Sequence, residues 1–309
     1  MKKSNLKIAA LSGMALFVSA VVSLSSCSAD AEEVMNNSSQ LSGPCASVRV
    51  HVSDFSISVE EFSEGRTRAV QDVADYTNVK AVDLAFYDGD TEILKATQVK
   101  GDGTYTTFGE FDCSLPLGTY TMVVVGRGWF DGDVFTLTSP TEAGYTSGFT
   151  RETFCATQSV TVTAAGADVS IALNRINSGI QIMSTDGRPS GVAKIRTTYA
   201  AGSKSFNPTT GLATVNTGFA NTVQGNGNTG QTTTATSYLF LATDEQTMDV
   251  TIETLDADGN TLFSKTVTDV PMRRNCLTTM TGAMYTNAGV SSGSFQINTE
   301  WLPGYDVPF

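Results

Sequence analysis

Hydrophobic and polar residues alternate with a period of two along most of the chain beyond residue 44. The first such segment slips in phase at Ser53-Asp54 and then resumes. Its apolar positions are Val48, Val50, Val52, Phe55, Ile57 and Val59. Alternation places successive side chains on opposite faces of a strand, and a one-residue slip is typical of a β-bulge. The pattern predicts a bulged strand with one buried face.

Similar patterns predict further strands and hairpins. Apolar positions on both sides of Asp88-Gly89-Asp90 predict a hairpin, and so do the alternating segments around residues 256–260. The unbroken apolar end of Tyr120–Val125 predicts a strand that is buried on both faces. Only Gln71–Asn78 fits a short turn of helix.

Turn signals divide these strands into two sets. The segment Asn216–Ser237 is polar and low in complexity, so we expect a long surface loop there. Short strands at regular spacing are typical of β-sandwiches. The pattern therefore predicts an all-β protein with two β-sandwich domains in tandem, 45–175 and 176–309, with the junction near Asn174–Asn177.

The N-terminus has the layout of an export signal. Three lysines precede the apolar run Ile8–Val22, and Leu24-Ser25-Ser26-Cys27 follows it. The run is short for a membrane span, and a Cys after Leu-Ser-Ser resembles a bacterial lipobox. We therefore expect a signal peptide over 1–26, a lipid (palmitate-type) modification of Cys27, and a polar tether over 27–44. The alternative is an ordinary signal peptide with an incidental Cys27.

Charge and cysteine content narrow the classes of partner. The whole chain has a net charge of −12, and loss of the three signal lysines leaves the mature chain at −15. Such a negative charge disfavours binding to nucleic acid and to anionic lipid surfaces. Export places the remaining cysteines in an oxidising compartment. Paired disulfides and free buried thiols are the two alternatives for these residues. These cysteines are Cys45, Cys113, Cys155 and Cys276.

Catalytic chemistry has little support in the sequence. The only histidine, His51, alternates with valines on a strand and is expected to face the surface. No Gly-x-Ser-x-Gly motif accompanies it, and no cysteines have metal-ligand spacing. The Asp-rich segments at 88–90 and 256–260 fit hairpin turns better than calcium loops. We predict a protein that is not an enzyme and has no catalytic residues, no metal site and no cofactor.

Exposed loops offer a different kind of function. Trp129 and Phe130 lie among glycines, where they could form an aromatic platform for sugar or an ordinary packed edge. A monomeric surface lipoprotein that binds glycan through β-sandwich loops is therefore the alternative function.

Three segments together resemble the fimbrillin superfamily, the major and accessory subunits of Bacteroidota type V pili. They are the strand before Arg66-Thr67-Arg68-Ala69, the segment Leu115–Thr121, and the segment Val270–Gly282, which contains Pro271 and Asn275. The resemblance runs from about Cys45 to Trp301. It implies transthyretin-like Greek-key sandwiches, export as an outer-membrane lipoprotein, and polymerisation by β-strand complementation.

The resemblance also implies specific site residues. In stalk subunits of this superfamily an arginine-specific protease removes the first strand, and a strand from a neighbouring subunit takes its place. The corresponding cut here follows Arg68, before Ala69, with Arg66 as second choice. The displaced strand would carry the apolar positions from Val48 to Val59. Accessory and anchor subunits of the superfamily keep this strand and their lipid, so stalk, tip and anchor roles all stay open.

These observations give one expected function. We expect a structural subunit of a surface fimbria that contributes to cell adhesion. Its expected partners are other pilus subunits or copies of itself, the outer membrane through the lipid, and a host or bacterial surface ligand. Its expected location is the outer membrane, the cell surface or the fimbrium.

Overall fold

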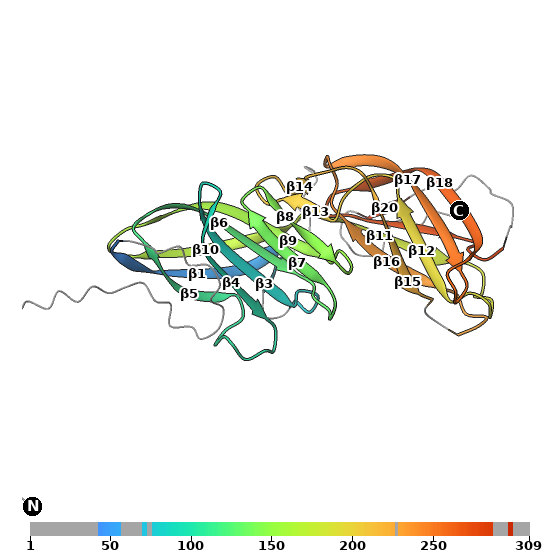
Figure 1. Cartoon of the computed structure of the whole chain (residues 1–309), viewed down its shortest axis with the longest axis horizontal. Helices are drawn as coiled ribbons and strands as arrows, with labels where there is room; N and C mark the ends of the chain where they lie inside the picture. Colours follow the sequence, from blue (N-terminus) through green and yellow to red (C-terminus); the bar gives the residue numbers. More distant parts are fainter. Residues whose placement is uncertain (1–42, 57–69, 73–75, 226–227, 287–295, 299–309) are drawn as a thin grey trace, which may run out of the picture.

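The computed structural model describes residues 43–56, 70–72, 76–225, 228–286 and 296–298 of the chain. These residues form an elongated molecule with two lobes (Figure 1). All regular elements within these ranges are β-strands, and none is a helix, so no membrane-spanning helix occurs among them. The all-β prediction is confirmed.

The first lobe is built on an eight-stranded sheet in the order β2-β1-β10-β9-β6-β3-β4, with β5 paired to β1. Its strands are β1 (Cys45–Ser56), β2 (Val70–Asp72), β3 (Ala81–Asp88), β4 (Thr91–Val99), β5 (Glu110–Pro116), β6 (Gly118–Arg127), β9 (Thr153–Val162) and β10 (Ala167–Arg175). Their inward side chains form one hydrophobic core, which includes Leu84, Met122, Val124 and Leu173.

The second lobe contains two four-stranded sheets that pack against each other. One has the order β16-β11-β19-β20 and the other β15-β12-β17-β18. Their strands are β11 (Ser178–Ser184), β12 (Lys194–Tyr199), β15 (Phe219–Gln224), β16 (Thr234–Leu239), β17 (Glu245–Leu255), β18 (Thr261–Arg273), β19 (Leu277–Gly282) and β20 (Gln296–Asn298). Side chains from both sheets, among them Ile180, Ile195, Ile252 and Met280, form a shared core, as in a β-sandwich.

A third small sheet lies where the lobes meet. It has the order β14-β13-β8-β7 and contains β7 (Val134–Ser139), β8 (Glu142–Ser147), β13 (Ser205–Asn207) and β14 (Leu212–Ala213). The pairing of β13 with β8 joins chain segments that lie on opposite sides of residue 175. A separate apolar cluster, with Tyr87, Val125, Phe206 and Phe240, fills this region. The lobes are therefore joined by packed side chains as well as by the covalent chain.

A buried ion pair also lies at the junction. Arg175, the last residue of β10, contacts Glu152 at 2.6 Å, and the two side chains are only 1% and 3% exposed. Arg175 also donates hydrogen bonds to the Asn275 amide oxygen (3.0 Å) and the Tyr76 hydroxyl (3.1 Å). Asn275 adopts a left-handed φ of 58°, which suits the tight turn between β18 and β19. The Asn in the late Pro-to-Gly segment thus forms the turn and contacts the first lobe.

Several local predictions are confirmed. The register of β1 against β10 shifts between Val52 and Asp54, which is the predicted bulge. Strand β6 is buried on both faces over its second half. The turns at 88–90 and 256–260 connect the hairpins β3-β4 and β17-β18.

The prediction of a long surface loop over Asn216–Ser237 is wrong. Phe219–Gln224 is strand β15, and Thr234–Leu239 is strand β16. Each lies at the edge of its sheet, where one side of the strand faces solvent and polar residues are tolerated. The segment Gln71–Asn78 was expected to fit a helical turn, but its first residues belong to strand β2.

We expect Glu152→Gln to lower the free energy of unfolding by about 3–5 kcal/mol, because it removes the Glu152 charge from the buried Arg175 guanidinium. Urea unfolding measures this change. Glu92→Gln is the matched control, since Glu92 pairs with Lys95 at 3.8 Å and is 45% exposed. That control should change stability by less than about 1 kcal/mol. Equal effects of the two variants would contradict the importance assigned to the junction pair.

Candidate assembly site around the first strand

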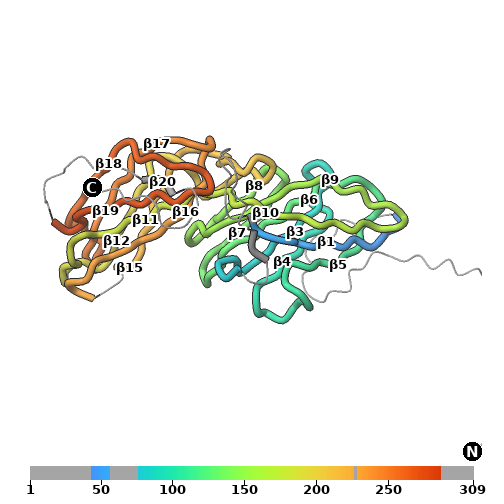
Figure 2. The backbone as a smooth tube through the Cα atoms, turned by 180° about the vertical axis from the view of Figure 1, so that it is seen from behind, coloured from blue at the N-terminus to red at the C-terminus, as the bar shows by residue number. Residues whose placement is uncertain are grey.

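Strand β1 is hydrogen-bonded on both of its edges. It pairs in parallel with β10 from Val48 to Ser56, and antiparallel with β5 from Cys45 to His51. Its C-terminal end also pairs with β2. The view from behind shows β1 between β10 and β5 (Figure 2). Loss of β1 would leave unpaired backbone groups on two neighbouring strands.

The inward face of β1 is part of the first lobe's core. Val48, Val50 and Phe55 are fully buried, and Val52 is 2% exposed. These four residues are the part of the predicted displaced strand that the structure describes, and they lie on one face as expected. Ile57 and Val59 lie outside the described residues. Full burial of side chains of this size contributes about 1.5–3 kcal/mol each.

Phe55 is the largest inward side chain of β1 and packs against two aromatic rings. Its ring centroid lies 4.9 Å from that of Phe154 and 5.7 Å from that of Tyr76. A Cβ atom at Gly126 would lie 2.7 Å from the Phe55 Cε1 atom, so only glycine leaves room for the ring. Sequence reasoning did not single out Gly126, although it interrupts the apolar run of β6.

The outward face of β1 is polar and charged. The Arg49 Nε donates to the Asp112 carboxylate on β5 at 3.0 Å, and Arg49 is in register with Asp168 on β10. The hydrogen bond and charge of Asp112, with the charge of Asp168, raise the pKa of Arg49. His51 lies on this exposed face, as expected, and contacts Glu110 on β5. Basic side chains of β1 therefore face carboxylates on both neighbouring strands.

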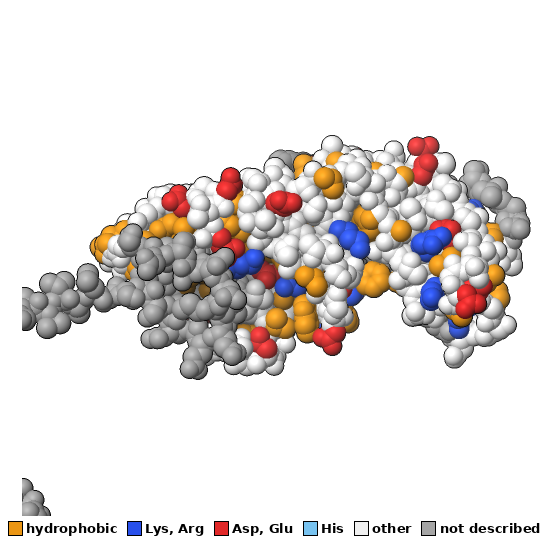
Figure 3. All heavy atoms as spheres, viewed as in Figure 1, with side chains coloured by type: hydrophobic (Ala, Val, Ile, Leu, Met, Phe, Trp, Pro, Cys, Tyr) orange, Lys and Arg blue, Asp and Glu red, His pale blue; other side chains and the backbone are white. Residues whose placement is uncertain are grey.

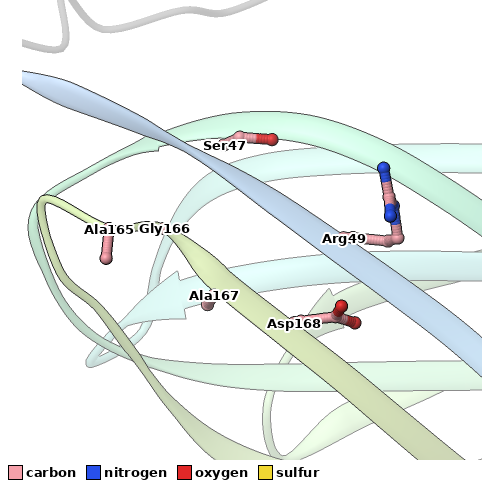
Figure 4. A pocket seen from close by; sticks show the side chains of 6 residues that line it. All are labelled: Ser47, Arg49, Ala165, Gly166, Ala167 and Asp168. Carbon is pink, nitrogen blue, oxygen red and sulfur yellow. The ribbon is translucent and has the colours of Figure 1, made fainter.

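The turn between β9 and β10 packs closely against β1. Ser47, Arg49 and Asp168 border a shallow hollow with the turn residues Ala165–Ala167 (Figure 4). Gly166 has a φ of +87°, and a Cβ atom there would lie 2.4 Å from the Ser47 carbonyl oxygen. The turn thus holds the N-terminal half of β1 through direct backbone contact.

Among the described cysteines, Cys113 and Cys155 are free thiols, and Cys45 is disulfide-bonded. The Cys113 thiol on β5 donates to the Val48 carbonyl oxygen of β1 at 3.5 Å. Burial raises the pKa of the Cys113 thiol to about 12. Since thiolates are the reactive form, this raised pKa lowers the reactivity of the Cys113 thiol.

The β1 site and the lobe junction share side chains. Tyr76 contacts the Phe55 ring on one side, and its hydroxyl donates to Glu152 at 2.5 Å on the other. Phe154 also contacts Phe55, while its ring lies 5.2 Å below the Arg175 guanidinium. The last inward residue of β1 therefore packs directly on the residues that surround the buried ion pair.

The other residues singled out from the sequence lie apart from β1. Trp129 and Phe130 are 37% and 58% exposed, and the Arg151 guanidinium lies 4.4 Å from the Phe130 ring centroid. In the 256–260 turn, Asp256 accepts hydrogen bonds from Asn260, which lower the pKa of Asp256. Within the described ranges, no group of three or more His, Cys, Asp or Glu side chains is placed to hold a metal ion.

Four predicted site residues lie outside the described residues. They are Cys27, the expected lipid site, and Arg66, Arg68 and Ala69, the expected processing site. The described strands that flank the expected processing site are β1, which ends at Ser56, and β2, which begins at Val70.

Residues 44–307 match the profile of a family that is described as a family of unknown function, DUF6562. The chain belongs to this family. The matched range begins at the residue before β1 and includes both lobes. A search of curated proteins found no match.

Several solved structures from Bacteroides and Porphyromonas show a limited similarity to this chain. A Bacteroides ovatus protein, described provisionally as an adhesin, has a TM-score of 0.47 and 10% identity, with 85% of this chain and 96% of that chain covered. A Bacteroides thetaiotaomicron protein, described provisionally as polysaccharide-binding, has a TM-score of 0.47 and 10% identity, with coverages of 82% and 96%. The fimbrial anchor protein Mfa2 of Porphyromonas gingivalis has a TM-score of 0.42 and 14% identity, with coverages of 81% and 95%.

We expect Gly166→Ala to weaken the packing of the β9-β10 turn against β1, because the new Cβ atom would collide with the Ser47 carbonyl oxygen. The matched control is Gly101→Ala, where φ is +90° and nothing lies within 4 Å of the new Cβ atom. Both variants share the strain of a left-handed residue, so their difference isolates the contact with Ser47. Gly166→Ala should be less stable than the control by about 1–3 kcal/mol in thermal unfolding. Equal stability would contradict the close contact.

Proposed function

We propose that this protein is a structural subunit of a surface fimbria that assembles by β-strand complementation and contributes to cell adhesion. The observation that carries the proposal is the position of β1, a central strand with four buried side chains at the N-terminal end of the fold. A strand supplied by another subunit in the same place would satisfy the backbone groups of β5 and β10 and refill the core.

The location of Arg68 supports this proposal. A cut after Arg68, or after Arg66, falls between the end of β1 at Ser56 and the start of β2 at Val70. The cut would therefore break the chain without removing a residue from the remaining strands. After such a cut the backbone would no longer connect β1 to β2, and another strand could replace it.

The same cut would separate the subunit from the membrane. We propose that the exported protein is attached to the outer membrane through a lipid on Cys27 and is exposed at the cell surface. Processing at Arg68 would release the lipid together with β1. An unprocessed chain would keep both and act as an anchor or accessory subunit. The proposed partners are other pilus subunits or copies of this chain, with a host or bacterial surface ligand.

A cross-strand disulfide provides a direct test of strand replacement. The Val52 amide donates to the Gly109 carbonyl, so these two residues form a hydrogen-bonded pair. Hydrogen-bonded and non-hydrogen-bonded pairs alternate along an antiparallel ladder. The pair Ser47 and Ser114 lies five positions away and is therefore a non-hydrogen-bonded pair. Such pairs have the short Cα separation that a disulfide needs. In Ser47→Cys/Ser114→Cys, oxidation should lock β1 to β5.

We expect a labelled synthetic β1 peptide to exchange into the chain after arginine-specific proteolysis. It should not exchange into the intact chain, the Arg66→Ala/Arg68→Ala variant, or the oxidised locked variant, and reduction of the lock should restore exchange. Gel filtration with fluorescence detection measures bound label. Equal labelling of the locked and reduced forms would show that the label does not occupy the β1 position.

Cys113 gives an independent readout of the same event. We expect alkylation of the Cys113 thiol to be slow while β1 is seated and at least about tenfold faster after proteolysis and removal of β1, because its burial is lost. Mass spectrometry of separate peptides measures each cysteine. Cys155 is the internal control, since it is buried in the apolar cluster between the lobes. Equal acceleration at both thiols would indicate general unfolding instead of strand release.

The second candidate function is glycan binding by a monomeric surface lipoprotein. The exposure of Trp129 and Phe130 favours it, because exposed aromatic faces can stack on sugar rings. A saturable ligand on a glycan array, lost on Trp129→Ala without loss of stability, would favour this function over assembly.

A further inference from the structure

The two faces of β1 give different information about what can replace it. The inward face needs three small branched side chains, a bulge and an aromatic ring, because Val48, Val50, Val52 and Phe55 fill the core. Many apolar strands meet this requirement. The outward face has a more specific chemistry, since its charged residues face charges on both neighbouring strands.

Departure of β1 would remove the basic side chains and leave the acidic ones. Arg49 and His51 belong to β1, whereas Glu110 and Asp112 belong to β5 and Asp168 to β10. In the register of the sheet, Asp112 and Asp168 lie on opposite sides of the same position of β1. The empty site would therefore present carboxylates from both of its edges to the residue at that position.

This charge arrangement is local. On the face shown in Figure 3, acidic and basic side chains lie in small separate groups and not in one broad field. Charges directly opposite each other in a sheet attract or repel according to their sign, and they influence partner choice and association rate more than total affinity. If the replacing strand slipped by one residue, its outward charged side chain would point into the core. The charge therefore also helps to select the register.

We propose that Asp112 and Asp168 are specificity residues that select a replacing strand with a basic side chain at the position of Arg49. This inference rests on the proposed strand exchange and names the partner's chemistry. The partner segment is extended, runs parallel to β10, and has the pattern small apolar, basic, small apolar, any residue, small apolar, any two residues, aromatic.

The C-terminal segment of this chain does not fit the pattern. The sequence from Asn275 to Phe309 contains no Lys, Arg or His, but it contains Glu300 and Asp306. The alternating stretch Phe295–Trp301 would place Gln, Asn or Glu toward the two carboxylates. The preferred donor is therefore a strand with a basic residue at this position, and not the C-terminal segment of a second copy.

Peptide exchange into the proteolysed full chain tests the inference. Four labelled probes are compared: the β1 sequence 45–59 with Cys45→Ser, the same peptide with Arg49→Gln, the same peptide with Arg49→Glu, and residues 294–309. We expect the affinity to fall in the order Arg, Gln, Glu, with about a tenfold difference between Arg and Glu. The 294–309 peptide should bind more weakly than the β1 peptide. Raising the salt concentration should reduce the charge-dependent differences.

Acceptor variants separate charge recognition from other effects. In Asp112→Asn/Asp168→Asn the order of the three β1 peptides should disappear. The matched control, Asp88→Asn/Asp90→Asn, changes two exposed carboxylates in the β3-β4 turn and should keep the order. If the double variant does not fold, Asp168→Asn alone is tested. It should halve the logarithm of the affinity ratio between the β1 peptide and its Arg49→Glu form.

The outcomes distinguish the inference from the function on which it rests. Equal affinity of the three β1 peptides, or binding of the 294–309 peptide as tight as that of the β1 peptide, would overturn the charge selection and leave strand exchange intact. Failure of every peptide to enter the proteolysed chain would overturn strand exchange itself.

Discussion

The structure of the first lobe depends on the double pairing of β1. This strand supplies hydrogen bonds to β10 on one side and β5 on the other, and its inward side chains complete the core. An edge strand could leave with modest loss, but a central strand cannot, because unpaired buried backbone groups are costly. The lobe therefore requires a strand at this position, and the proposed function is that another subunit can supply it.

The consequences of an empty β1 position reach the lobe junction. Phe55 covers Tyr76 and Phe154, and these residues surround Arg175 and Glu152. A buried ion pair is stable only while its surroundings exclude water and complete its hydrogen bonds. Occupation of the β1 position thus also supports the contacts that join the first lobe to the turn at Asn275.

The sequence predicts the local features of β1 but not its place in the sheet. Alternation and the phase slip at Ser53 are local signals, and they correctly predicted the buried face and the bulge. The pairing partners lie far along the chain, since Val48 is opposite Cys113 on one side and Ala167 on the other. No period in a single segment encodes such distant pairings, so the central position of β1 and the acidic neighbours of Arg49 emerged only from the structure.

Two further features were missed for physical reasons. Strands β15 and β16 are edge strands with exposed polar residues such as Thr222, Gln224 and Thr236, so their composition resembled that of a loop. Hairpin β13-β14 is short, and its pairing with β8 depends on the packing of the two lobes. Glycines such as Gly126 are informative only after the neighbouring ring of Phe55 is known.

The central claim is that β1 is a replaceable strand, and the N-terminus of the protein on the cell surface tests it most directly. Mass spectrometry of the chain recovered from intact fimbriae or outer membranes identifies its first residue and any lipid. The account predicts assembled subunits that begin at Ala69 without lipid, while another strand occupies the position between β5 and β10. If every assembled copy retained β1 and an acylated Cys27, strand replacement in this chain would be contradicted.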